Sequence, residues 1–279
     1  MGGQLSVGGS KLTSLQVAAA LVADGCRLGF GGQPALARRP MGFARELVRQ
    51  RRGDLHLFNQ IGGLEIDLLI GAGLVESTNC CYVGLGDLGP SPHFQRAARE
   101  GSVAIAEYSE FTLVASLRAA GMDLPFMPWK TAWGSQLVDL NGWKQIRCPY
   151  TGVDLLAVPA NALDVAVIQV ESCDECGNVP LPDPLEISYD FDFLICRAAR
   201  QVIVCAERVE PIDDPSRVAL FGREVSAVVD FPNGAWPCAL GSSYGVDFEH
   251  LVDTYLPAAA AADSFDAYLA DHVLGRREP

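Results

Sequence analysis

The residues whose types best indicate chemistry form a glycine-rich turn at Gly31 and Gly32. An apolar run typical of a buried strand, Cys26 to Phe30, precedes the turn, and apolar residues return at helical spacing after Pro40. A strand, a tight turn and a helix N-terminus place backbone N–H groups at one sheet edge, where an anion or a thioester carbonyl can bind. The glycine spacing matches neither the dinucleotide nor the Walker fingerprint, so NAD and ATP are not the expected ligands.

A second glycine-rich turn runs from Asn59 to Gly63 and contains Gln60, Gly62 and Gly63. Its backbone N–H groups can form part of an oxyanion site for a thioester carbonyl. The alternative is an ordinary turn, after which Glu65 is solvated in the first turn of the next helix.

Two carboxylates, Glu107 and Glu110, follow the apolar run Val103 to Ala106. The carboxyl end of a parallel strand is where open α/β sheets bind ligands, and a partly buried carboxylate there can act as a general base or a nucleophile. The structural alternative is that Ser109 caps the next helix and Glu110 lies in its first turn. The sequence leaves both interpretations open, and also the choice between the two glutamates.

The cysteines do not indicate a metal site. Cys173 and Cys176 have Cys-x-x-Cys spacing, but no second such pair or histidine pair completes a tetrahedral set, so we expect no metal. We interpret this segment as a turn formed by Asp174, Gly177 and Asn178. Nine cysteines at irregular spacing are also unlike a secreted disulfide framework.

Composition excludes several classes of protein. The chain has 279 residues, 49% of them apolar, and 34 acidic against 21 basic residues give a net charge of −13. This acidity argues against nucleic acid as a partner, since that role needs a basic face. No stretch approaches the roughly 20 apolar residues that span a bilayer, and the N-terminus lacks the basic and apolar regions of a signal peptide. We therefore expect a cytoplasmic protein with no membrane partner.

Strand-like and helix-like segments alternate along the chain, which predicts an α/β fold with a mostly parallel sheet flanked by helices. We expect one domain over residues 1–279, with an aromatic-rich excursion at 125–150 that is an elaborated loop or a subdomain. The expected strands are 26–30, 55–58, 80–83, 103–106, 165–170, 201–205 and 225–229. The expected helices are 15–22, 40–50, 64–70, 90–100, 111–120 and 189–199, with a helical tail at 248–255 and 264–273.

Together, and in this order, these segments resemble the α subunit of the family I coenzyme A transferases over nearly the whole chain. The first matching signature joins Asp24-Gly25, Gly31-Gly32 and the helix that opens on Pro40. Arg38-Arg39-Pro40-Met41 and the long tail look most like the glutaconate CoA-transferase branch, which also contains a steroid-ring-opening CoA hydrolase and a decarboxylase. The other matching segments are 59–63, 107–113, 118–126, 169–178 and 232–237.

The resemblance implies an acyl-CoA thioester as substrate, no permanently bound cofactor, and a homologous β subunit in a heterodimer or an α2β2 heterotetramer. In the transferases of this family the thioester is attacked by a glutamate in a Ser-Glu-Asn-Gly-type loop of the β subunit. This chain has no such loop and resembles the partner half. In that setting Arg38 or Arg39 is expected to pair with a substrate carboxylate or a CoA phosphate.

Two departures from the family pattern keep other functions open. Trp236 stands where a histidine is usual, and Glu110 stands where short-chain transferases carry glutamine. A glutamate in this region is a feature of the ring-opening hydrolase, so Glu110 or Glu107 is a candidate general base that activates water. A third hypothesis, from another class, is a non-catalytic ligand-sensing module.

Overall fold

A parallel sheet of seven strands forms the centre of the computed structural model, which describes residues 9–185 and 189–275. The predicted lack of a signal peptide concerns an N-terminus of which residues 1–8 lie outside this description. The strand order is β12-β10-β8-β1-β2-β3-β4, and each neighbouring pair is parallel. The strands are β1 Arg27–Phe30, β2 Leu55–Gly62, β3 Val75–Val83, β4 Ala104–Glu107, β8 Leu163–Cys173, β10 Ala199–Val209 and β12 Ala227–Asp230.

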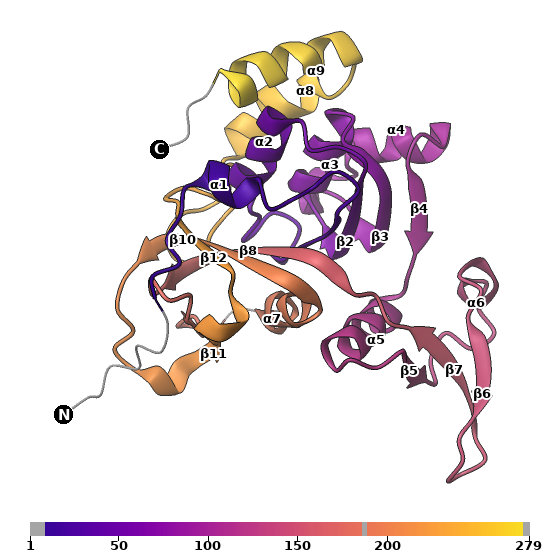
Figure 1. Ribbon diagram of the computed structural model, residues 1–279. Coiled ribbons are helices and arrows are strands. Elements are labelled where there is room, and N and C mark those ends of the chain that lie inside the picture. Colours follow the sequence, from indigo (N-terminus) through magenta and orange to yellow (C-terminus); the bar gives the residue numbers. More distant parts are fainter. Residues whose placement is uncertain (1–8, 186–188, 276–279) are drawn as a thin grey trace.

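Helices cover both faces of the sheet, which confirms the predicted fold class (Figure 1). One face carries α1 Leu15–Ala19, α2 Met41–Gln50, α3 Leu64–Gly71, α4 Pro92–Glu100 and the C-terminal tail. The tail contains two π-helical segments, His250–Tyr255 and Leu269–Leu274, together with α8 Leu256–Ala258 and α9 Ala262–Tyr268. The other face carries α5 Glu110–Gly121 and α7 Tyr189–Arg197.

Two apolar clusters hold these layers together, one on each face of the sheet. Strand β8 contributes to both, because Val165 and Val167 point to the α2 and α3 side while Ala166 and Ile168 point to the α5 and α7 side. Strands buried on both faces read as continuous apolar runs, which is why β8 is visible in the sequence. None of the helices in the described part of the chain is long and apolar enough to cross a membrane.

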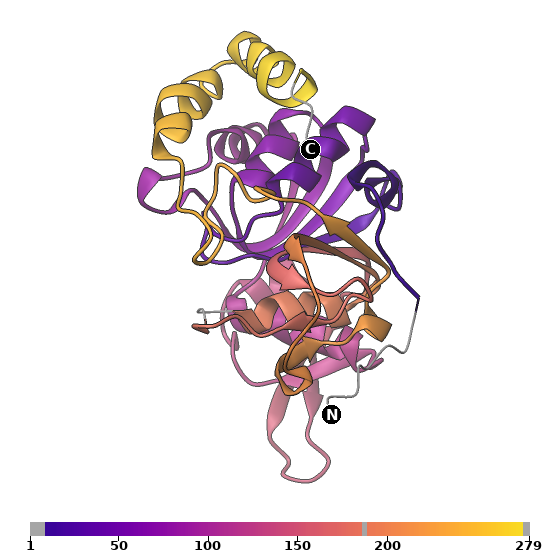
Figure 2. The ribbon, with the colours of Figure 1, turned by 90° about the vertical axis from the view of Figure 1, so that its left-hand side faces the viewer.

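The aromatic-rich excursion is a small antiparallel sheet that projects from the body (Figures 1 and 2). Its strands, in the order β5-β7-β6, are Phe126–Trp129, Asp154–Pro159 and Lys144–Arg147. Trp143 packs with Leu156 and Val158 in a core of its own, and the short helix α6, Leu137–Leu140, lies beside it. We expected residues 125–150, and the sheet continues to Pro159 because β7 pairs with both other strands.

Smaller elements complete the fold, and several boundaries differ from the predicted ones. Strand β3 begins at Val75 rather than Cys80, because the polar segment Glu76 to Asn79 pairs with β2 without an apolar pattern of its own. The remaining elements are an antiparallel pair, β9 Val179–Pro180 and β11 Val218–Leu220, and short 3-10 turns at Gly86–Leu88, Pro215–Arg217 and Gly222–Glu224.

The strand order reverses between β1 and β8. From β1 the chain builds β2, β3 and β4 toward one edge of the sheet, and then crosses to build β8, β10 and β12 toward the other. Open α/β sheets bind their ligands outside the carboxyl ends of the strands at such a switch point. The loop that follows β1 is therefore the expected centre of a site.

Candidate functional site

Two side-chain amides meet beyond the carboxyl ends of β1 and β2. The Nε2 atom of Gln33 donates a hydrogen bond of 2.6 Å to the Oε1 atom of Gln60. Gln33 is buried and Gln60 is half-buried. Within the residues that the structure describes, the Nε2 atom of Gln60 has no acceptor, so it can donate to a ligand.

The row of polar side chains continues toward the edge of the sheet. The register of β2 with β3 places Gln60 beside Cys81, on the face where Phe58 packs against α5 and α7. Glu110 begins α5 on the same face, and it contributes, after burial and Cys80, to the raised pKa of the Cys81 thiol. We call Gln33, Gln60, Cys81 and Glu110 the amide row.

The two candidate carboxylates lie on different faces. Glu107 is the register partner of Cys80, one residue before Cys81, so it points away from the amide row. Both glutamates are exposed. The Ser109 hydroxyl accepts a hydrogen bond of 3.2 Å from the backbone N–H of Thr112, so the predicted helix cap is confirmed and Glu110 lies in the first helical turn.

The glycine-rich turns do not supply the backbone donors that we expected. The Gly31 N–H donates to the Val167 carbonyl at 2.9 Å, and the Gly32 N–H donates to Oδ1 of Asp192 at 2.6 Å. The Gly63 N–H donates to Oε1 of Glu65 at 3.2 Å.

The fourth glycine of the predicted oxyanion loops, Gly62, ends β2 and is buried. The side-chain amide of Gln60 replaces these groups as the available donor.

The glycines serve instead to bring the two turns into contact. A side chain at Gly63 would place its Cβ 2.2 Å from the carbonyl oxygen of Ala35, in the other turn. Gly32 has φ of +98°, and a Cβ there would lie 2.5 Å from the Arg38 carbonyl oxygen. Only glycine permits this approach and this backbone conformation.

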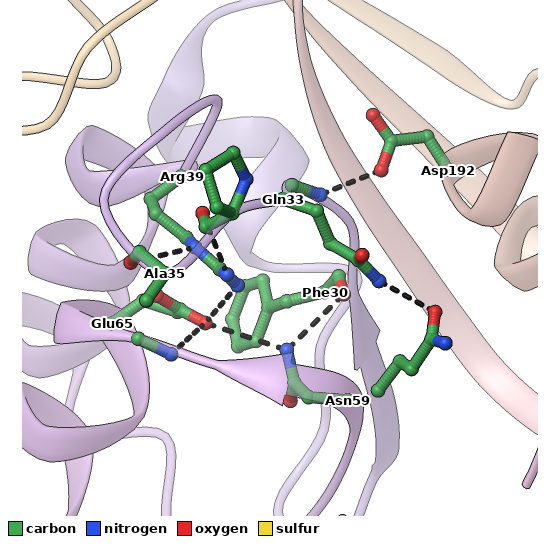
Figure 3. Close-up of polar contacts among 11 residues, drawn as sticks. Phe30, Gln33, Ala35, Arg39, Asn59, Glu65 and Asp192 are labelled. Atoms are coloured by element: carbon green, nitrogen blue, oxygen red, sulfur yellow. Dashed lines mark hydrogen bonds and ion pairs between the residues drawn. The ribbon is translucent and has the colours of Figure 1, made fainter. Parts of the chain in front are cut away.

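Arg38 and Arg39 are buried, which corrects the expectation that they face a substrate carboxylate or a CoA phosphate. The guanidinium of Arg39 pairs with Glu65 at 3.0 Å, and neither side chain is exposed to solvent (Figure 3). The guanidinium of Arg38 pairs with Asp192 at 3.3 Å, also in the interior. Their charges are neutralised inside the fold and are not presented to a ligand.

The carboxylate partners of these arginines were not predicted. Glu65 was expected to be solvated, but it is fully buried, because α3 packs its first turn against the loop after β1. Burial raises the pKa of Glu65 and of Asp192, and the neighbouring arginines oppose that effect. The one sequence signal was the pair Glu65 and Asp67 within the otherwise apolar run Leu64 to Ile70, because exposed helices rarely lack a polar face.

The Cys-x-x-Cys segment forms the predicted turn. The Asp174 carboxylate accepts hydrogen bonds from the backbone N–H of Asn178 at 2.8 Å and from its side-chain amide at 2.7 Å, while the Gly177 N–H donates to the Asp174 carbonyl. Among residues 9–185 and 189–275, no group of three His, Cys, Asp or Glu side chains is placed to hold a metal ion.

Comparisons with known proteins agree with this architecture. The cholesterol ring-cleaving hydrolase IpdA subunit of Rhodococcus jostii is 30% identical over 285 residues, 96% of this chain and 93% of that one. The corresponding chain of the glutaconate CoA-transferase of Acidaminococcus fermentans is 28% identical over 292 residues, and these cover 96% and 89% of the two chains. The crystal structure of that transferase superposes with a TM-score of 0.87 at 26% identity, covering 96% of this chain and 90% of that one.

A relative of longer chain is also found. An uncharacterized protein of Archaeoglobus fulgidus is 31% identical over 260 residues, which are 91% of this chain and 57% of that one. This chain thus spans a little over half the length of that relative. The sequence profile described as Coenzyme A transferase matches residues 12–219, most of the chain. The chain therefore belongs to the coenzyme A transferase family.

Proposed function

We propose that this chain is the α subunit of a heteromeric enzyme that transfers coenzyme A between carboxylic acids, with an acyl-CoA thioester bound at the amide row. The observation that carries the proposal is the Gln33–Gln60 pair, since it aims an uncommitted N–H donor outward beside the switch point of the sheet. An amide donor at this place can stabilise the oxyanion that forms when a thioester carbonyl is attacked. This donor set favours an enzyme over the ligand-sensing module.

In the transferase, the nucleophile comes from the partner. A carboxylate oxygen of the partner glutamate attacks the thioester carbon, the C–S bond breaks, and CoA leaves as a thiolate. The thiolate then attacks the glutamyl carbonyl of the resulting anhydride, which releases the carboxylic acid and leaves glutamyl-CoA. Gln60 donates to the oxyanion in the first attack, while Gln33 holds the Gln60 amide in place.

The β4 edge of the sheet supports the presence of a partner. Parallel sheets are normally covered on both faces, yet Ala104, Ile105 and Glu107 of this edge strand are exposed. Phe111, in the first turn of α5, is 63% exposed beside Glu110. A homologous β subunit over this edge would bury apolar surface and close the amide row against water.

A second candidate is a hydrolase of the same fold, and the position of Glu110 on the amide row favours it. In this reaction Glu110 removes a proton from water, and the hydroxide adds to a ring ketone of a β-dicarbonyl acyl-CoA. The C–C bond then breaks, and the proton goes to the carbon that leaves as an enolate. Glu107 is the alternative base, although it points to the other face.

The test begins with the partner. The tagged chain is purified gently from its own cells, and the protein that accompanies it is identified by mass spectrometry. The complex is then given acetyl-CoA with glutaconate or 3-oxoadipate, and, separately, a cyclic β-dicarbonyl acyl-CoA whose product would gain the mass of one water.

The outcomes separate the candidates. A partner with a Ser-Glu-Asn-Gly-type loop and exchange of CoA between acids would support the transferase. A related partner without that glutamate, with a loss of about a hundredfold in Glu110→Gln and little change in Glu107→Gln, would support the hydrolase. If no partner copurifies, the heteromer proposal is wrong.

A further inference from the structure

The buried Arg39–Glu65 pair lies directly behind the amide row. The side chains of Asn59 and Gln60 alternate across β2, so Gln60 faces α5 and α7 while Asn59 faces α3 on the opposite side. There the Asn59 amide donates to Glu65 at 3.4 Å and to the Phe30 carbonyl at 3.2 Å (Figure 3). Glu65 thus contacts the residue that precedes Gln60.

The arginine makes the matching contacts to the other turn. Its Nη2 donates to the Pro34 carbonyl at 3.1 Å, its Nε donates to the Ala35 carbonyl at 3.1 Å, and its Nη1 donates to Glu65. Pro34 follows Gln33 directly in the chain. One guanidinium therefore ties the backbone after Gln33 to the carboxylate that holds Asn59 and Gly63.

We propose that Arg39 and Glu65 are positioning residues that fix the distance and orientation of the Gln33–Gln60 amide pair from behind the sheet. The inference rests on the proposed function of the amide row. Planar guanidinium geometry is essential to this role, because three N–H groups must point at two carbonyls and one carboxylate at once. A lysine ammonium keeps the charge but cannot reach all three acceptors in the same arrangement.

The principal test is Arg39→Lys in the purified complex, because that variant retains the buried charge pair. We expect kcat to fall by about tenfold or more while KM stays within about threefold, because a misplaced oxyanion donor is lost in the transition state and not in substrate binding. The matched control is Arg49→Lys. Arg49 also bridges a carboxylate, Glu46, and a carbonyl, that of Val273, on the tail side of α2. We expect Arg49→Lys to leave kcat unchanged.

A second readout needs no turnover. Hydrogen exchange of the amides in 33–36 and 59–65 is compared between the wild type, Arg39→Lys and Arg49→Lys, with β8 as the internal reference. We expect Arg39→Lys to increase exchange in both turns together, because one side chain holds both. If Arg39→Lys misfolds, the neutral pair Arg39→Met with Glu65→Gln replaces it, since removing both charges avoids an unpaired buried ion.

Each outcome decides the proposal. If Arg39→Lys, or the neutral pair, keeps kcat within about threefold of the wild type, or loosens one turn alone, the positioning role is overturned. If the wild-type complex turns over no acyl-CoA and yet both turns loosen together, the proposed function fails and the structural coupling of the turns stands.

Discussion

Gly32 and Asp192 are 160 residues apart in the chain, and the N–H of Gly32 donates a hydrogen bond of 2.6 Å to the Asp192 carboxylate. The same carboxylate pairs with Arg38, six residues after Gly32. Asp192 comes from α7 on one face of the sheet, and Arg39, the residue after Arg38, pairs with Glu65 of α3 on the other. Two consecutive arginines thus anchor the loop after β1 to both faces of the sheet.

Neutralising Asp192 should destabilise the protein strongly. Asp192→Asn leaves the buried Arg38 charge without its partner, and we expect the free energy of unfolding to fall by about 3–5 kcal/mol in urea denaturation. The control is Asp154→Asn, which breaks the pair of Arg147 and Asp154, whose side chains are 74% and 60% exposed. That change should cost less than about 1 kcal/mol. Equal losses in both variants would contradict a structural role for the Arg38–Asp192 pair.

Adding one methyl group at Gly63 should separate the two turns. Its Cβ would lie 2.2 Å from the Ala35 carbonyl oxygen, which is backbone and cannot move aside cheaply. We expect Gly63→Ala to lower the free energy of unfolding by about 1–3 kcal/mol. Gly53→Ala is the control, since no atom lies within 4 Å of its Cβ position. A Gly63→Ala variant as stable as Gly53→Ala would show that the turns do not need their close approach.

Removing the Gln60 amide should slow turnover in the complex with its partner. Gln60→Leu keeps the side-chain volume and deletes the proposed donor, so we expect kcat to fall by about a hundredfold with little change in KM. Gln145→Leu, at an exposed position of β6, is the matched control and should leave kcat unchanged. Unaltered kcat in Gln60→Leu would remove the amide row from the mechanism.

The pH dependence of stability should reveal two opposed buried groups beneath the tail. Burial raises the pKa of Asp67, which accepts hydrogen bonds from Tyr255 and Phe94, to about 6. Burial, assisted by Arg96, lowers the pKa of His93 to about 4. The contribution of Asp67 to stability is lost as pH rises from about 4 to 6, whereas that of His93 is lost as pH falls from about 6.5 to 4.

Single variants separate these effects. Relative to the wild type, the free energy of unfolding of Asp67→Asn should rise by about 3 kcal/mol between pH 4 and pH 7, because the unfavourable ionisation is removed. The same difference for His93→Gln should change in the opposite direction. Urea denaturation at several pH values measures both, and slopes of equal sign would refute the assignment.

Much of the fold could be predicted because its signals are local. Apolar runs of four to six residues marked the buried strands, and the glycine and proline positions marked the turns that end β1 and β2. Strand β3 was shortened because its first half is polar, and the small sheet β5-β7-β6 was missed because its core has only three buried side chains. These two segments depend on pairing between distant strands.

The sequence by itself determined the layers of this protein, the family it resembles and the turns that border its site. Only the tertiary structure decided what each polar residue there does, because a charge finds its partner through contacts between distant segments. Arg38 and Arg39 resembled anion ligands until Asp192 and Glu65 were seen to neutralise them. Gln33 drew no attention until the pairing of β1 with β2 brought Gln60 to it. Desolvation explains both results, since a buried polar group must find a partner and the fold determines which one it meets.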